Sequence, residues 1–189
     1  GVYSASGTVT RSTVLASTNN NLPISLSGGA TIFITPNTTN IHAGYYGSWY
    51  DTTNQTISNA GNVARMTFNT EAETYGVSRV ITSGTGTGIK ILYAGVYDLQ
   101  FSVQYINTDT AIHNSTIWLR INGQDVPYSA GQSSIPNSHG GTAGQLIAAW
   151  NYLQSFKVND IVELWWSVDN TQAFLETIPA GSSPVTPAA

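Results

Sequence analysis

Residues 93–105 read YAGVYDLQFSVQY, and after the glycine the stretch alternates between two sets of side chains. The apolar set, which shares one side of the run, is Tyr97, Leu99, Phe101, Val103 and Tyr105. The opposite set is mainly polar and consists of Val96, Asp98, Gln100, Ser102 and Gln104. A period of two residues is typical of a β-strand with one buried face. The stretch therefore predicts a sheet whose apolar face is covered by a second layer.

Further strand-like segments follow one another closely between residues 44 and 178. The clearest are VARMTFN at 63–69, GVSRVI at 76–81, STIWLRI at 115–121, AGQLIAAWNYLQSF at 143–156 and DIVELWWSV at 160–168. Helix competes only at 143–156, where Ala, Leu and Gln favour it, and the neighbouring segments favour a strand there too. The glycine-rich run TSGTGTG at 82–88 predicts a flexible approach to the strand at 93–105. The fold class that follows is all-β.

The composition limits the function classes that are open to the chain. Its 189 residues suffice for one sizeable β-domain, and with no cysteine it has neither disulfides nor thiolate metal sites. Charged residues make up 8% of the chain, against roughly 25% in ordinary soluble domains. Its six Lys and Arg are scattered, so we expect no nucleic-acid partner. No apolar run approaches the ~18 residues that span a bilayer, so we expect no membrane insertion.

The chain divides into three parts by its pattern. Residues 1–43 hold short β-like pieces, such as TIFIT at 31–35, and are expected to form a β-rich N-terminal extension. Residues 44–178 carry the main domain. Residues 179–189, PAGSSPVTPAA, are proline-rich without an apolar period and predict an extended tail.

Three local features together indicate a family. They are a Gly95-x-Tyr97 start to a long strand, an Asn122-Gly123 turn after a strand, and a polar turn that ends at Asp160. With the segments around them, they resemble the jelly-roll domain of the complement globular head and tumour necrosis factor families. The stretch YYGSWYDTTNQT at 45–56, taken with the later segments, resembles virion domains of tailed bacteriophages that are found on fibres, knobs and capsid decorations. The resemblance covers roughly residues 44–178.

The resemblance implies a jelly-roll β-sandwich that assembles as a homotrimer. It also implies aromatic residues along the threefold contact, which in this sequence would be Tyr46, Trp49, Tyr50, Tyr97 and Trp150. The family closes its inner sheet with a further strand, and here either AFLETI at 173–178 or an N-terminal piece such as 31–35 would have to serve, unless the chain is truncated. We expect residues 31–35, or a neighbouring subunit, to supply it, because a bare strand edge leaves backbone groups unpaired.

Two polar loops are the candidate recognition sites, because binding residues usually lie on loops held by a rigid scaffold. They are NTDTAIHN at 107–114 and SAGQSSIPNSHGG at 129–141, and the alternative is that both are plain solvated connections. The candidate residues are Asn107, Asp109, His113, Asn137 and His139.

Catalytic and metal chemistry is not indicated by the sequence. No His has a partner at metal-ligand spacing, no nucleophile elbow occurs, and we predict no catalytic residue, metal or cofactor. Glu71 and Glu73 favour a solvated loop, although a threefold assembly could gather them around a cation. Adjacent Trp165 and Trp166 must point to opposite faces of a strand.

These expectations combine into one interpretation of function. The chain is predicted to be a non-enzymatic structural protein of a phage virion surface, either a capsid decoration or the head of a fibre. Residues 1–43 would anchor it to capsid or tail proteins, and its loops would adhere to host-surface glycans. The alternative is a secreted complement-head-like carbohydrate-binding module. The scarcity of clustered acids, His and Cys argues against an enzyme.

Overall fold

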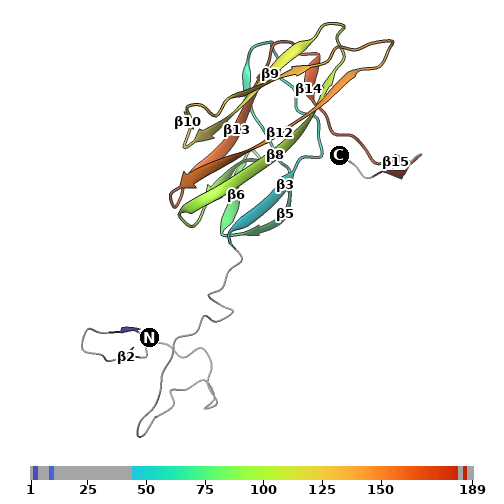
Figure 1. Cartoon of the computed structure of the whole chain (residues 1–189). Coiled ribbons are helices and arrows are strands. Elements are labelled where there is room, and N and C mark those ends of the chain that lie inside the picture. The colour runs from blue at the N-terminus through green and yellow to red at the C-terminus, as the bar shows by residue number, and fades with distance from the viewer. Residues whose placement is uncertain (1, 4–8, 11–43, 183–184, 187–189) are drawn as a thin grey trace. The chain divides into compact units, whose positions relative to one another are not determined.

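The computed structural model describes residues 2–3, 9–10, 44–182 and 185–186 (Figure 1). Contacts divide the chain into two units, Gly1–His42 and Ala43–Ala189. In the first unit, Val2–Tyr3 (β1) pairs antiparallel with Val9–Thr10 (β2). The predicted strand at residues 31–35 lies outside the described residues.

The second unit consists of antiparallel strands, and no helix occurs in the part of the chain that the structure describes. Its large sheet has seven strands in the order β10-β9-β13-β7-β6, with β11 paired to β9 and β4 paired to β13. These strands are β4 (Val63–Arg65), β6 (Val77–Thr82), β7 (Thr85–Ile91), β9 (His113–Ile121), β10 (Gln124–Asp125), β11 (Gly131–Ile135) and β13 (Ile161–Val168).

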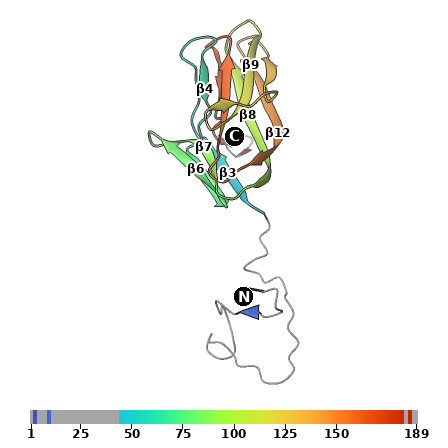
Figure 2. The same cartoon turned by 90° about the vertical axis from the view of Figure 1, so that its left-hand side faces the viewer.

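A small sheet of three strands lies against the large one, in the order β12-β8-β14 (Figure 2). Gly95–Asn107 (β8) and Gly144–Phe156 (β12) pair along their whole length, and Ala173–Leu175 (β14) pairs with the last three residues of β8. Two short pairs complete the unit: β3 (Tyr46–Tyr50) with β5 (Thr70–Tyr75), and β15 (Gly181–Ser182) with β16 (Val185–Thr186).

The core lies between the two sheets, which gives the unit a sandwich-like arrangement. Tyr105 of β8 is fully buried, its ring lies 6.2 Å from that of Trp166 of β13, and its hydroxyl is 2.6 Å from the Ser115 hydroxyl of β9. A second buried cluster surrounds Leu119 and Phe156 nearer the start of β8. The apolar set of β8 faces this core and its polar set faces away, so the alternation predicted for residues 93–105 is confirmed.

The strands predicted at 76–81, 115–121, 143–156 and 160–168 are all present, and 143–156 is strand rather than helix. Asn122 and Gly123 have φ angles of 53° and 79°, as the predicted tight hairpin turn requires. Trp166 is fully buried, whereas Trp165 lies on the other face beneath the guanidinium of Arg120, whose Cζ is 4.0 Å from the ring centre.

Three expectations were wrong. The glycine-rich run at 82–88 is not a flexible approach, because only its turn at Ser83 and Gly84 is irregular and Thr85–Ile91 is a strand of the large sheet. A Cβ on Gly86 would overlap the Phe68 carbonyl oxygen, so glycine permits a close approach there. Glu71 and Glu73 lie in strand β5 rather than in a loop, and Gly131–Ile135 is a strand inside the loop predicted at 129–141.

Candidate functional site

The side of the small sheet that points away from the core is the first candidate. We call it the outer face, and its exposed side chains are Val96, Asp98, Gln100, Ser102, Gln145, Ile147, Ala149, Asn151, Leu153 and Ser155. Leu153 is 74% exposed, Val96 66% and Ile147 64%. Ordinary β-sheets turn a polar face to water, so aliphatic side chains that are this exposed are the informative feature.

Asp98 is the one charged residue of the outer face. Its carboxylate accepts hydrogen bonds from the side-chain amides of Gln100 (2.7 Å) and Asn151 (3.0 Å). These bonds, that of Asn151 above all, hold the pKa of Asp98 below its ordinary value because they stabilise the charged form. The charge is thus fixed within a surface that is otherwise neutral.

The five aromatic residues predicted at a threefold contact lie in different environments. Tyr97 and Trp150 point into the core side of the small sheet, where Trp150 packs edge-on against Phe101 with ring centres 4.6 Å apart. Trp49 is half-buried and donates from Nε1 to Glu71 Oε2 over 3.0 Å. Tyr46 and Tyr50 expose 51% and 53% of their surface. The contact stays a prediction, and Tyr46 and Tyr50 are the most accessible of the five.

Stacked tyrosines gather at the end of the unit where β8 begins. The Tyr45 ring stacks on that of Tyr93 with 4.4 Å between centres, and the Tyr75 and Tyr97 rings lie 6.0 and 6.4 Å from it. The Tyr97 hydroxyl donates to the Tyr93 carbonyl oxygen over 2.7 Å. Burial raises the pKa of Tyr97, because the phenolate is poorly solvated there. Nothing in the sequence groups Tyr75 with Tyr93, because this cluster depends on β3 and β5 lying beside β8.

At the opposite end of β8, His113 lies between two carboxylates. Its Nε2 is 2.8 Å from Asp109 Oδ2, and its Nδ1 is 3.0 Å from Asp169 Oδ1. Carboxylates only accept hydrogen bonds, so each contact requires a proton on the ring nitrogen that makes it. The hydrogen bond from His113, followed by that from the Thr110 backbone N–H, lowers the pKa of Asp109. Asp169 is distant from His113 along the chain and carried no signal of its own in the sequence.

The same end holds both predicted recognition loops together. The Ser138 N–H donates to the Asp109 carbonyl oxygen over 2.7 Å, which joins the loop after β8 to the loop after β11. Asn107 is fully buried and supports the first loop by donating to the Ala111 carbonyl oxygen over 2.8 Å. Of the five candidates, His139 is exposed, Asp109 and Asn137 are half-buried, and Asn107 and His113 are buried. Ile112, which the sequence did not single out, is 61% exposed.

The described part of the chain shows no cluster of three or more His, Asp, Glu or Cys side chains suited to a metal ion. Within the same residues, no helix is long and apolar enough to cross a membrane.

Comparison with known proteins adds no relative. No protein-family model matches the chain, and no curated protein is significantly similar to it. Function is therefore inferred from the outer face and the loop end of the β8–β12 ladder.

Proposed function

We propose that this chain is a non-enzymatic structural protein of a tailed-phage virion surface, a capsid decoration or fibre head, whose jelly-roll domain assembles as a homotrimer. The main support for assembly is the composition of the outer face. It exposes Val96, Ile147 and Leu153 and bears a single charge. Protein interfaces are depleted in charge at their centre, and exposed aliphatic patches mark them.

The sheet arrangement supports the jelly roll. Two antiparallel sheets stack across one core, and each contains a pair of strands that are far apart in sequence: β9 pairs with β13, and β8 pairs with β12. Such long-range antiparallel pairing is typical of Greek-key sandwiches and jelly rolls. The resemblance of residues 44–178 to virion domains of tailed phages supplies the biological setting.

The two ends of β8 support a role in display. Residue 44, where the N-terminal segment joins, adjoins Tyr45 at the tyrosine end, and the recognition loops lie at the Asn107 end. The extended length of β8 separates those ends by about 40 Å. In this proposal residues 1–43 anchor the chain to capsid or tail proteins, and the loops at the Asn107 end bind host glycans. Three copies would add their weak contacts through multivalency.

The test measures the native mass of the full chain by light scattering. We expect a trimer, and we expect Leu153→Glu to give monomers, because burying three carboxylates near the threefold axis is unfavourable. Val158→Glu is the matched control, since Val158 is 53% exposed but lies in the turn after β12, and it should remain trimeric. A monomeric wild type would contradict the assembly.

The virion location needs a separate test. Peptide mass fingerprints of purified phage particles should contain this chain if it is a virion protein. Glycan-array binding without a virion location would favour the secreted carbohydrate-binding module instead.

A further inference from the structure

One edge of β8 has few partners. Its other edge pairs with β12 over the whole strand, but on this edge only Tyr105–Asn107 pair with β14, followed by one bond from the Glu176 N–H to the Gln104 carbonyl oxygen (2.9 Å). Backbone groups of an antiparallel strand alternate between its edges. The N–H and C=O groups of Ser102, Gln100, Asp98 and Val96 therefore point to the same edge as those of Gln104. Among the described residues, these groups have no backbone partner.

The strand β14 does not continue along this edge. After Glu176 the chain turns aside, because the Thr177 N–H donates to Asn54 Oδ1 over 2.8 Å. Pro179 then has no N–H to offer. The strand β14 therefore ends beside Tyr105, although the free edge of β8 continues for the rest of its length. Unpaired edges of this kind are templates for another strand.

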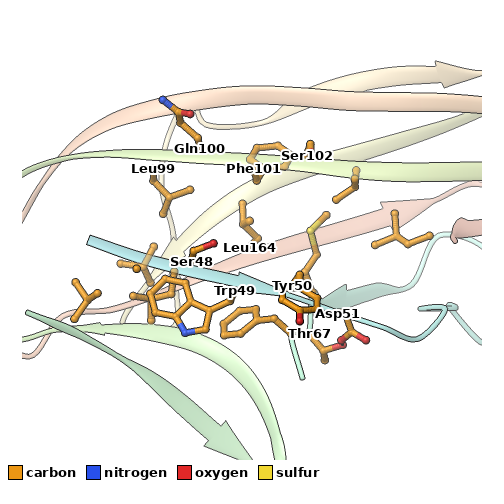
Figure 3. Close-up of a pocket in the computed structure, with 18 of the residues that line it drawn as sticks. Ser48, Trp49, Tyr50, Asp51, Thr67, Leu99, Gln100, Phe101, Ser102 and Leu164 are labelled. Carbon is orange, nitrogen blue, oxygen red and sulfur yellow. The ribbon is translucent and has the colours of Figure 1, made fainter. Parts of the chain in front are cut away.

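An apolar groove runs beside the free edge. It is a cavity of about 710 Å³ between β8 and β3, open to solvent. Leu99 and Phe101 of β8 and Leu164 of β13 project into it (Figure 3). All three are only half-buried, although they belong to the apolar side of the sandwich. An occupant that combined apolar side chains with backbone hydrogen bonds would complete both the core and the ladder.

The charges around the groove have one sign. The acidic residues that line it are Asp51, Asp98 and Glu176, and no Lys, Arg or His is among the described residues of the lining. A basic occupant is therefore favoured over an acidic one. A lipid or a small apolar molecule would fill the cavity but would leave the backbone groups of β8 unpaired, whereas a peptide strand satisfies both.

We propose that the free edge of β8 receives an extended segment of another protein, added as a strand antiparallel or parallel to β8. Residues 31–35 of this chain, expected above at this position, fit the acidic groove less well because residues 12–64 contain no Lys or Arg. Its alternate side chains are aliphatic and enter the groove, and its flanking residues are Lys or Arg. This goes beyond the proposed function and does not depend on it, since the edge lies within one copy of the domain. The kind of partner that fits is a flexible basic tail with a two-residue apolar period.

The probe is the synthetic peptide Lys-Val-Thr-Val-Thr-Val-Thr-Lys, added to the full chain and followed by NMR hydrogen exchange. We expect slower exchange of the amides of the free edge on binding, with no change at Leu99 and Phe101, whose amides already face β12. The control peptide has the same side chains but carries N-methyl groups on the backbone nitrogens that face β8, and it should not bind. If it binds as well as the first, or if neither protects these amides, strand addition is wrong.

Two further outcomes are decisive. Protection of these amides in the chain without peptide would show that the edge is taken by this chain or a second copy, and would overturn the proposal of a foreign strand. Asp98→Asn should weaken peptide binding roughly two- to fivefold, as loss of one exposed ion pair does. Asp125→Asn removes a carboxylate outside the groove lining and should leave the affinity unchanged. Equal affinity for both variants would show that the acidic residues of the groove lining do not attract the basic flanks of the peptide.

Discussion

The Tyr105 hydroxyl lies in the interior of the sandwich and has a defined chain of partners. It donates to Ser115 Oγ (2.6 Å), and Ser115 in turn donates to the Ser167 carbonyl oxygen (2.8 Å). Burial raises the pKa of Tyr105 to about 12, so the phenol stays neutral at physiological pH. The chain of hydroxyls links β8 of the small sheet to β9 and β13 of the large one.

These bonds predict an asymmetry between two substitutions. Ser115→Ala leaves the buried Tyr105 hydroxyl without a partner and should destabilise the fold by about 1–3 kcal/mol. Tyr105→Phe leaves Ser115 still bonded to Ser167 and should cost about 0.5–1.5 kcal/mol. Urea unfolding measures both free energies. A larger loss of unfolding free energy for Tyr105→Phe than for Ser115→Ala would contradict the hydrogen-bond directions given above.

Asp109 makes the loop end sensitive to acid. Its pKa in the folded protein lies below the ordinary value of 3.8, chiefly because His113 donates to it. A lowered carboxyl pKa stabilises the folded state fully above the ordinary value, and the contribution is lost as the pH falls through the lowered pKa. NMR shifts of the Thr110 and Ser138 amides should therefore show a transition below about pH 4, where Asp109 takes up its proton. Asp109→Asn should abolish that transition, whereas Asp125→Asn, at a distant turn, should not.

At the scale of the element, the two long strands of the small sheet both begin with glycine, for different reasons. A Cβ on Gly144 would overlap the Pro136 carbonyl oxygen, so only glycine lets β12 pass the loop after β11. A Cβ on Gly95 would meet only the Tyr97 ring, at an ordinary 3.6 Å.

Gly144→Ala should therefore destabilise the fold by about 1–3 kcal/mol through overpacking against backbone. Gly95→Ala should be neutral or stabilise it by up to about 1 kcal/mol, because alanine restricts the unfolded chain. Urea midpoints of the two variants make the comparison. If the two variants were equally stable, the loop at 136–143 would have to shift freely, and its close packing on β12 would not matter.

The elements that could be predicted from the sequence are those whose signal is local. Alternation predicted β8, and the Asn122-Gly123 pair predicted the hairpin turn after β9. The strand β7 was missed because Gly86 and Gly88 weaken its pattern, and the reason for glycine there is the approach of Phe68 and Val162 from elsewhere in the sheet. No local rule reveals such an approach.

The candidate sites divide in the same way. Ile147 and Leu153 put aliphatic residues on the polar side of 144–156, so the outer face could be recognised once that segment was known to be a strand. His113 could be proposed as a recognition residue, but its contact with Asp169 depends on the pairing of β9 with β13, which brings Asp169 beside the start of β9. The resemblance placed Tyr97 and Trp150 at the threefold contact because they are aromatic. Their position on the apolar side of their strands already indicated that they belong to the core.

For the whole molecule, the main question is which part carries assembly. The unit Ala43–Ala189 has its own buried clusters across two sheets, and it contains the whole outer face. If the outer face makes the trimer, a chain that lacks residues 1–43 should fold and keep a trimeric mass by light scattering, while losing attachment to purified virions. Leu153→Glu in that shortened chain should be monomeric with an unchanged β-rich circular dichroism spectrum, which separates lost assembly from lost folding.

A shortened chain that is monomeric and folded would instead place assembly in residues 1–43. In that case the exposed aliphatic residues of the outer face would have to serve a different contact, and multivalent display would depend on the extension rather than on the sandwich.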